Sequence, residues 1–90
     1  MDIIKELSNN INIKIQKFNE IYLSCCEKII EVDKYGFKDL LYTIPINVEY
    51  NINECREYIE NLLREKGFSI YTISNHQFFI TWHSLLPSIQ

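Results

Sequence analysis

The segment from Gly67 to His83 constrains the fold of this chain most. It reads GFSIYTISNHQFFITWH, in which two runs rich in β-branched and aromatic residues flank the polar stretch Ser74–Gln77. Two such runs separated by a short polar stretch are typical of a β-hairpin. Asn75 is expected to adopt left-handed backbone geometry in the turn, which asparagine tolerates. We expect the rest of the chain to cover one face of this hairpin.

The alternation of side chains along the hairpin separates two faces. The predicted core face combines Phe68 and Ile70 of the first strand with Phe78, Ile80 and Trp82 of the second strand. This leaves a second face that is too apolar for exposure to bare solvent, so it is either covered or an interface. Its apolar members are Tyr71, Ile73 and Phe79.

Residues 2–32 contain neither glycine nor proline and predict one long helix. Its apolar residues recur at steps of three and four, which gives one continuous stripe. A helix of about 30 residues spans about 45 Å, more than the width of a three-stranded sheet, so residues 1–12 are expected to overhang or fray. Ser8–Asn10 is the predicted weak point, where the helix would start late or break. The stripe consists of Ile4, Leu7, Ile11, Ile15, Phe18, Tyr22, Cys25, Ile29 and Val32.

The remaining elements follow from local signals. A turn at 33–38 with Gly36 precedes a strand at 40–44, which Pro45 ends because proline lacks a backbone donor. A second helix is predicted at 52–66, with a glycine just beyond its end. Its N-cap is either Asn51, with Glu54 completing a capping box, or Asn53. The fold class is therefore α+β, in one domain spanning 1–90: a long N-terminal helix, a strand, a second helix and the C-terminal hairpin. Its small three-stranded antiparallel sheet would be covered by helices, and 84–90 would form a tail.

Composition narrows the class of protein. Ninety residues are enough for one domain, and 47% of them are hydrophobic, which excludes a disordered chain. The net charge is −3 and the basic residues are scattered, whereas a protein that tracks phosphates needs clustered positive charge. No apolar run is long enough to insert into a membrane, and no signal peptide is evident. Three cysteines, two of them adjacent, favour a reducing intracellular setting over a disulfide framework.

The residues that could carry chemistry do not form a recognisable motif. A metal site needs converging ligands, and no cysteine or histidine pair has the spacing that would bring two ligands to one point. Cys55 with His76 or His83 lacks a group that would orient a base, and acidic residues on a helix face are usually solvated. We predict no catalytic residue, no metal and no cofactor. The candidates considered were Cys25, Cys26, Cys55, His76 and His83 as ligands, and Glu54, Glu57 and Glu60 as acids or bases.

Aromatic residues of the hairpin support an alternative function. Trp82 and the pair Phe78 and Phe79 could stack on the bases of a nucleic acid. Core packing is the favoured interpretation, because lysine and arginine do not surround them in the sequence. A nucleic-acid-binding module that uses the hairpin is thus the alternative, and it would require basic residues to cluster in space.

Residues 42–87 contain three runs, YTIP, EYNINECREYIENLLREKGF and FFITWHSLLP. In these runs the chain resembles small uncharacterised proteins of the nucleocytoplasmic large DNA viruses. The chain departs from this pattern at Ser74, where the family often has proline, and at Thr81, where serine is usual. The resemblance implies a viral protein associated with the virion, and it implies no catalytic residue. The matching residues are Pro45, Tyr50, Cys55, Tyr58, Leu62, Gly67, Phe68, Ile80, Trp82, His83 and Pro87.

These observations predict a non-enzymatic interaction or assembly component, whose partner is itself or another protein. Two interpretations of the helical stripe remain open: it is wholly core, or its N-terminal half contacts another chain. A homo-oligomer or part of a larger complex is expected, in the host cytoplasm or the virion if the protein is viral. The residues predicted to make the contact are Ile4, Leu7, Ile11, Phe18, Tyr71 and Phe79.

Overall fold

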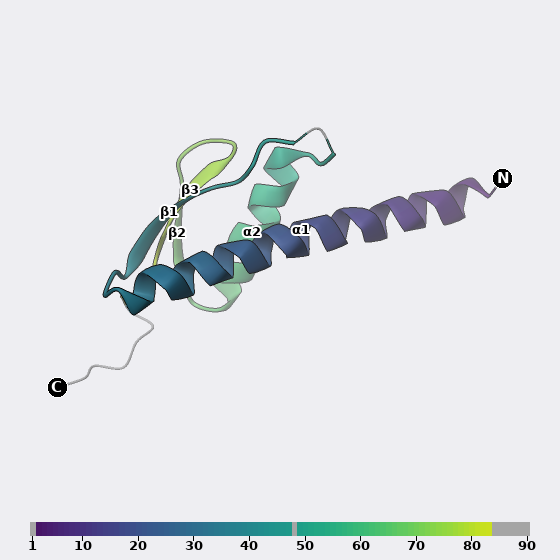
Figure 1. The fold of residues 1–90 in the computed structure, drawn as a ribbon. Helices are drawn as coiled ribbons and strands as arrows, with labels where there is room; N and C mark the ends of the chain where they lie inside the picture. Colours follow the sequence, from purple (N-terminus) through teal and green to yellow (C-terminus); the bar gives the residue numbers. More distant parts are fainter. Residues whose placement is uncertain (1, 48, 84–90) are drawn as a thin grey trace.

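The computed structural model describes residues 2–47 and 49–83 and shows the predicted α+β fold (Figure 1). A long helix is followed by a strand, a second helix and a hairpin. The three strands form one antiparallel sheet in the order β1-β3-β2. The elements are α1 (Ile3–Lys34), β1 (Asp39–Thr43), α2 (Ile52–Glu65), β2 (Ser69–Thr72) and β3 (Gln77–Thr81).

Helix α1 is continuous over 32 residues, so the break predicted at Ser8–Asn10 is wrong. The Asp2 carboxylate caps its first turn by accepting from the backbone N–H groups of Ile4 and Lys5, at 3.2 and 3.4 Å. Asparagine lowers helix propensity by less than about 1 kcal/mol per residue, and the cap and the uninterrupted backbone ladder outweigh that cost. The helix ends before Gly36, whose φ of 93° requires a glycine.

Strand β3 lies in the centre of the sheet, although it is the last strand in the sequence. Its residue Ile80 lies between Leu40 of β1 and Ile70 of β2, which places three apolar side chains in one row on the inner face. Strand β1 begins and ends one residue before the predicted range. Among the described residues no amino acid other than glycine has a positive φ, so the left-handed geometry predicted for Asn75 is wrong. Instead, Ile73 and Ser74 both donate to the Gln77 carbonyl oxygen.

Helix α2 begins directly after Asn51, one of the two predicted caps, and ends one residue before the predicted end. The Asn51 side chain accepts from the Glu54 backbone N–H at 3.1 Å. The second half of the predicted capping box is absent from the described contacts, because the Glu54 carboxylate turns to Lys14 of α1. Gly67 follows the helix with a φ of 95°, as a glycine after a helix end commonly does.

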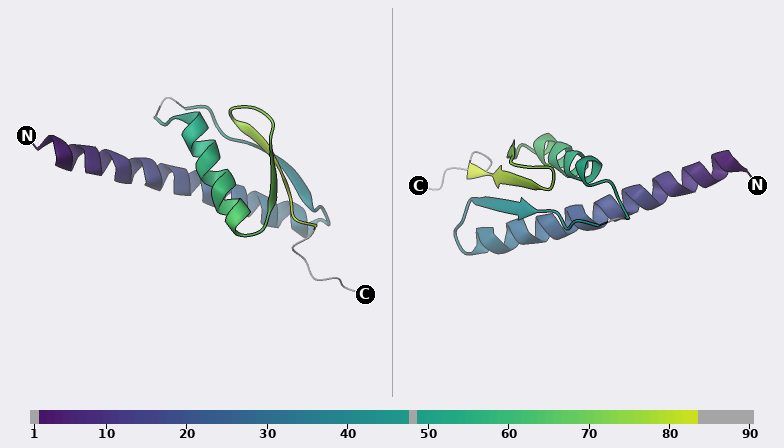
Figure 2. Two further views of the ribbon diagram at one scale, coloured as in Figure 1. Left: turned by 180° about the vertical axis from the view of Figure 1, so that it is seen from behind. Right: turned by 90° about the horizontal axis from the view of Figure 1, so that it is seen from above.

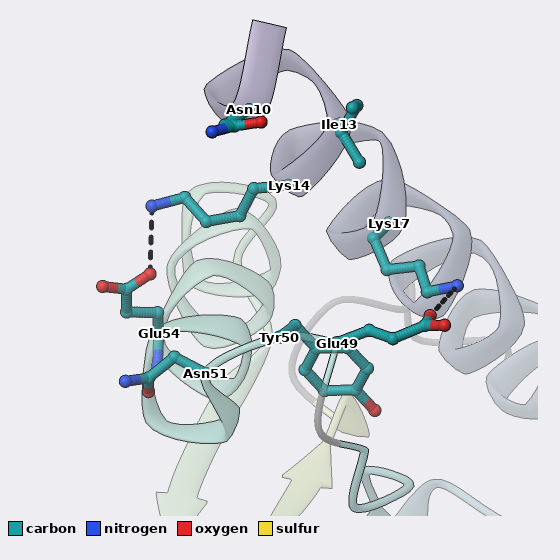
Figure 3. A pocket seen from close by; sticks show the side chains of 8 residues that line it. All are labelled: Asn10, Ile13, Lys14, Lys17, Glu49, Tyr50, Asn51 and Glu54. Atoms are coloured by element: carbon teal, nitrogen blue, oxygen red, sulfur yellow. Dashed lines mark hydrogen bonds and ion pairs between the residues drawn. The ribbon is translucent and has the colours of Figure 1, made fainter. Parts of the chain in front are cut away.

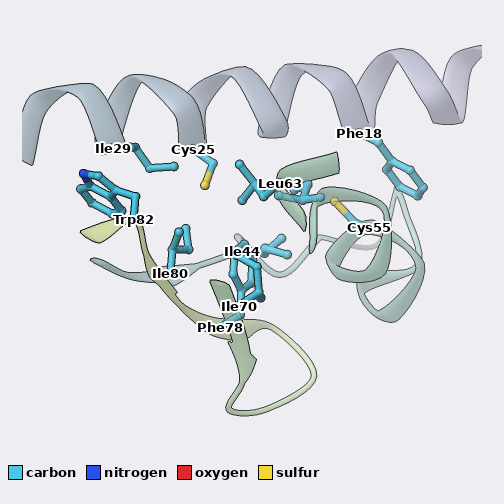
Figure 4. Close-up of a cluster of buried hydrophobic side chains, with 11 residues drawn as sticks. Phe18, Cys25, Ile29, Ile44, Cys55, Leu63, Ile70, Phe78, Ile80 and Trp82 are labelled. Carbon is cyan, nitrogen blue, oxygen red and sulfur yellow. The ribbon is translucent and has the colours of Figure 1, made fainter. Parts of the chain in front are cut away.

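The core lies between the inner face of the sheet and the two helices (Figure 4). Helix α1 lies against β1, and α2 lies against β2. Only the second half of α1 takes part, because its first core residue is Phe18. The buried apolar residues are Phe18, Cys25, Ile29, Ile44, Cys55, Ile59, Leu63, Ile70, Phe78, Ile80 and Trp82.

The first half of α1 projects beyond the rest of the fold (Figure 2). The molecule is elongated, with extents of 63 × 23 × 19 Å. We call residues 3–16 the overhang. All of them are exposed, and the N-terminal part of α1 lies away from the sheet in every view. The overhang predicted for 1–12 is thus present as ordered helix from Ile3 onward. The predicted tail 84–90 lies outside the described residues.

Candidate functional site

The apolar stripe of the overhang is the first candidate surface. Ile4, Leu7 and Ile11 remain 72, 55 and 52% exposed. At 3.6 residues per turn these residues continue the helix face that carries Cys25 and Ile29 in the core. The face that packs inside the molecule therefore extends into solvent without a covering element from the described part of the chain.

Phe18 does not belong to this surface, although it was predicted to contact a partner. It is only 3% exposed and lies at the boundary between the overhang and the packed half of α1. Its ring meets those of Tyr50 and Tyr58, with centroids 6.3 and 5.5 Å away. The sequence pattern could not place this boundary, because the apolar spacing is the same on both sides of it.

The outer face of the sheet is the second candidate surface. The strand register aligns Leu41, Phe79 and Tyr71 in one row across the three strands. Tyr71 is 59% exposed, and its ring centroid lies 6.4 Å from that of the partly exposed Phe79. Leu41 and Ile73 are also exposed. The hairpin alternation predicted Tyr71 and Phe79 on this face, but it missed Leu41, which comes from the separate strand β1.

A cleft of about 850 Å³ lies where the overhang meets the N-terminus of α2 (Figure 3). Two ion pairs cross it: Lys14 Nζ lies 3.1 Å from Glu54 Oε2, and Lys17 Nζ lies 2.9 Å from Glu49 Oε2. The hydrogen bond and the charge of Glu49 raise the pKa of Lys17. All four side chains are more than a third exposed, so solvent screens both pairs and they add little to stability. The cleft is therefore lined by charges that a partner could still engage.

The cysteines and histidines do not converge. Cys25 and Cys55 are buried in the core, where desolvation raises their pKa values to about 12 and about 11. His76 lies in the β2–β3 turn beside Asn75, and His83 is exposed at the end of the described chain. Within residues 2–47 and 49–83, no group of three or more histidine, cysteine or acidic side chains could hold a metal ion.

Glu60 contradicts the expectation that the acidic residues of α2 are solvated. It is only 3% exposed, and its carboxylate accepts a 2.6 Å hydrogen bond from the Thr72 hydroxyl of β2. Its other oxygen lies 3.5 Å from Arg56 Nε, one helical turn away. Arg56 also donates to the Asn75 carbonyl oxygen in the turn. This small polar network joins α2 to the hairpin, and we assign it a structural role because its carboxylate has almost no solvent access.

The aromatic residues proposed to stack on bases are mostly unavailable. Phe78 is fully buried, and Trp82 is buried with its indole N–H donating to Asp33 Oδ1 at 2.9 Å. Lys38 Nζ also contacts Asp33, at 2.6 Å, so this carboxylate joins the end of α1 to the residue before β1 and the residue after β3. Phe79 alone of the three is partly exposed. A stacking platform built from these three rings therefore does not exist in this fold.

Neither α1 nor α2, the helices of the described residues, has the length and hydropathy needed to cross a membrane. The chain matches no protein-family model, no curated protein and no solved structure. The resemblance of residues 42–87 to proteins of large DNA viruses therefore stays an interpretation of the sequence. The two exposed apolar surfaces are the features from which a function can be argued.

Proposed function

We propose that this protein is a non-enzymatic interaction or assembly component that binds a protein partner through exposed apolar surfaces. One observation carries the proposal: the core-facing stripe of α1 continues through Ile11, Leu7 and Ile4 after the packed part of the molecule has ended. Exposed apolar patches of this kind mark interaction sites in soluble proteins.

The energetics of the overhang support this proposal. An isolated helix shorter than about 12–15 residues is marginal in water, and most helical stability comes from packing of the apolar face. The overhang has 14 residues, 3–16, and includes three asparagines and no alanine. Docking of its stripe on a partner would supply the packing that the rest of the described chain does not.

The outer sheet face would be the second contact. Its row of Leu41, Phe79 and Tyr71 alternates along the strands with the row of Leu40, Ile80 and Ile70 that faces the core, and it gives an exposed apolar surface. The resemblance described above extends the proposal to a virion-associated component of a large DNA virus, located in the host cytoplasm or the virion. Its partner would be a second copy or a larger protein.

Substitutions on each surface test the proposal. Leu7→Asp combined with Ile11→Asp disrupts the stripe, and Tyr71→Asp disrupts the outer face. Leu23→Asp is the matched control, because Leu23 is exposed on α1 but lies off the stripe. We expect at least one surface variant to reduce self-association in light scattering, or cross-linking to a partner in the source cells, while the control does neither. A wild-type protein that stays monomeric and cross-links to nothing would refute the proposed function.

A further inference from the structure

We propose that residues 84–90 of this chain pack back into an apolar groove between α1 and the C-terminal end of α2. This surface is separate from the stripe of the overhang and from the outer sheet face, so the proposal goes beyond the proposed function. We call it the helix groove, and its volume is about 260 Å³. Its apolar lining is formed by Tyr22, Cys26, Ile29 and Ile30 of α1, by Leu63 of α2 and by Phe68.

The helix groove has apolar side chains that no described residue covers. Leu63 and Ile29 are buried in it, whereas Ile30 at its rim is 69% exposed. Among the described residues that line the groove, only Lys66 carries a charge. Pockets for small molecules usually have volumes of about 300–1,000 Å³, so this groove suits a few apolar side chains better than a cofactor.

The described part of the chain ends beside this groove. Trp82 follows β3, and its ring centroid lies 6.2 Å from that of Phe68 in the groove lining. Its backbone N–H donates to the Lys38 carbonyl oxygen at 3.0 Å, and its indole N–H donates to Asp33 Oδ1 at 2.9 Å. Because β1 and β2 both begin opposite Thr81, the C-terminal ends of the two helices lie at this same end of the sheet (Figure 2). The next residues of the chain therefore start where the groove opens.

The order of side chains in residues 84–90 fits an apolar groove. The segment reads SLLPSIQ, and Pro87 favours an extended backbone at the residue before it. In an extended segment every second side chain shares a face, so Leu85, Pro87 and Ile89 form one wholly apolar face. The opposite face carries a single leucine among two serines and a glutamine. The segment can thus place one face in the groove and keep the other in solvent.

The length of the segment agrees with that of the groove. From Leu85 to Ile89 an extended backbone spans about 13 Å, at about 3.3 Å per residue. The groove wall from Tyr22 to Ile30 spans about 12 Å, at 1.5 Å per residue of helix. The segment would enter from the sheet and run along α1 toward the overhang, with Leu85 against Ile30 and Ile89 against Tyr22. The middle of the segment then faces Cys26.

The covalent link favours this segment over a separate molecule. A segment joined to the fold by a short linker has an effective concentration on the order of millimolar at its site. A separate molecule must instead offset the entropy of association, and a few apolar side chains bury far less than the about 1,200–2,000 Å² of stable interfaces. The helix groove therefore suits a segment that Trp82 already holds beside it.

Thiol labelling of Cys26 in the full chain tests the proposal. Leu85→Asp combined with Ile89→Asp charges the apolar face of the segment and should release it from the groove. Cys26 should then react with a thiol reagent about fivefold faster or more, because access controls the rate. The matched control is Ser84→Asp combined with Ser88→Asp, which adds the same charge on the opposite face. It should leave the rate within about twofold of wild type.

Disulfide trapping tests the position of the segment and the copy that supplies it. Oxidation of the Pro87→Cys variant with copper phenanthroline should join the introduced thiol to Cys26 within one chain, because a disulfide needs Cα atoms within about 7 Å. Cys25 and Cys55 are buried and should not compete. Gln90→Cys is the matched control, since Gln90 lies beyond the groove on the polar face, and it should form this bond at least about fivefold more slowly.

The outcomes decide the proposal without touching the proposed function, because every substitution lies outside the stripe and the outer sheet face. Faster labelling of Cys26 in Leu85→Asp with Ile89→Asp alone, together with the intrachain disulfide, supports it. Equal labelling in wild type and both double variants overturns it. A disulfide-linked dimer at micromolar protein also overturns it, because a second copy would then fill the groove. Cys25 that stays unreactive in each variant shows that the fold is intact.

Discussion

Within α1, Ile11 and Ile29 lie on the same face, five helical turns apart, yet they are 52 and 7% exposed. The half of the helix that holds Ile29 rests on the sheet, whereas the half that holds Ile11 extends past it. The two halves have the same apolar spacing and opposite environments. An apolar helical stripe therefore identifies a surface that needs a partner, but not whether that partner is in the same chain.

Amide hydrogen exchange should show the largest difference between the halves. Backbone amides around Ile29 are expected to exchange through global unfolding, with opening free energies of about 5–15 kcal/mol. Amides of residues 5–12 should exchange with opening free energies close to zero in dilute protein, because an exposed helix end frays. Equal protection of both halves in dilute protein would show that the first half of α1 is packed within the monomer. Protection of residues 5–12 that grows with protein concentration would show that a second copy covers this half.

Two identical substitutions give the next largest difference. Ile29→Ala should lower the free energy of unfolding by about 2–5 kcal/mol, because it opens a cavity in the core. Ile11→Ala should change it by less than about 0.5 kcal/mol, because the side chain is exposed and alanine favours helix. Urea unfolding followed by circular dichroism, at concentrations where the protein is monomeric, measures both. A loss at Ile11 as large as that at Ile29 would mean that the overhang is packed within the monomer.

Thiol labelling tests whether only one face of the packed half of α1 is buried against the sheet. Cys25 is buried and its pKa is raised to about 12, first by desolvation and then by the neighbouring Cys26. Cys26 is the next residue along and is partly exposed. We expect Cys26 to react with a thiol reagent at least about tenfold faster than Cys25 near pH 8, because access and the thiolate fraction control the rate. Similar rates in the folded protein would show that this half of α1 is not fixed on the sheet.

Substitution of Asp33 is expected to have the smallest effect on stability, and it tests the contacts that hold the C-terminal end of α1. Its contacts with Lys38 and then Trp82 lower the pKa of its carboxyl group below the ordinary value. The unfolded chain therefore binds this proton at a higher pH, so the contribution to stability is present above about pH 4 and is lost as the pH falls through the folded pKa. Asp33→Asn should reduce the loss of stability at acidic pH, measured as the free energy of unfolding against pH. If wild type and variant lose the same stability at acidic pH, the contacts of Asp33 with Lys38 and Trp82 do not stabilise the fold.

The elements of the fold were largely predictable from local signals. The two helices, the hairpin faces and the glycines at positions 36 and 67 follow from spacing and backbone chemistry, and strand β1 was displaced by a single residue. Asn51 was predicted as a cap, but Asp2 was missed, although an acidic residue directly before an apolar helical run is the usual signal. Asn75 was mispredicted because the turn closes through bonds to Gln77 without left-handed geometry.

The candidate surfaces were less predictable, because exposure depends on which distant elements meet. Phe18 was assigned to an interface, but Tyr50 and Tyr58 cover it, and both are more than thirty residues further along the chain. Glu60 was expected in solvent, and its burial depends on Thr72 in the next element. Ile4, Leu7, Ile11 and Tyr71 are exposed as their predicted role requires. Their partner is a matter for the experiments above.

The central position of β3 in the sheet has a consequence for biosynthesis. Strands β1 and β2 each pair with β3, so neither has a neighbour until the third strand has been made. During translation α1 is complete long before residues 77–81 leave the ribosome, and until then its entire stripe lacks the sheet that will cover half of it. Domains form as units when their long-range contacts become available. A nascent chain of this protein therefore exposes more of the apolar stripe of α1 than the folded protein does. We expect chaperones to bind this stripe before the sheet covers it.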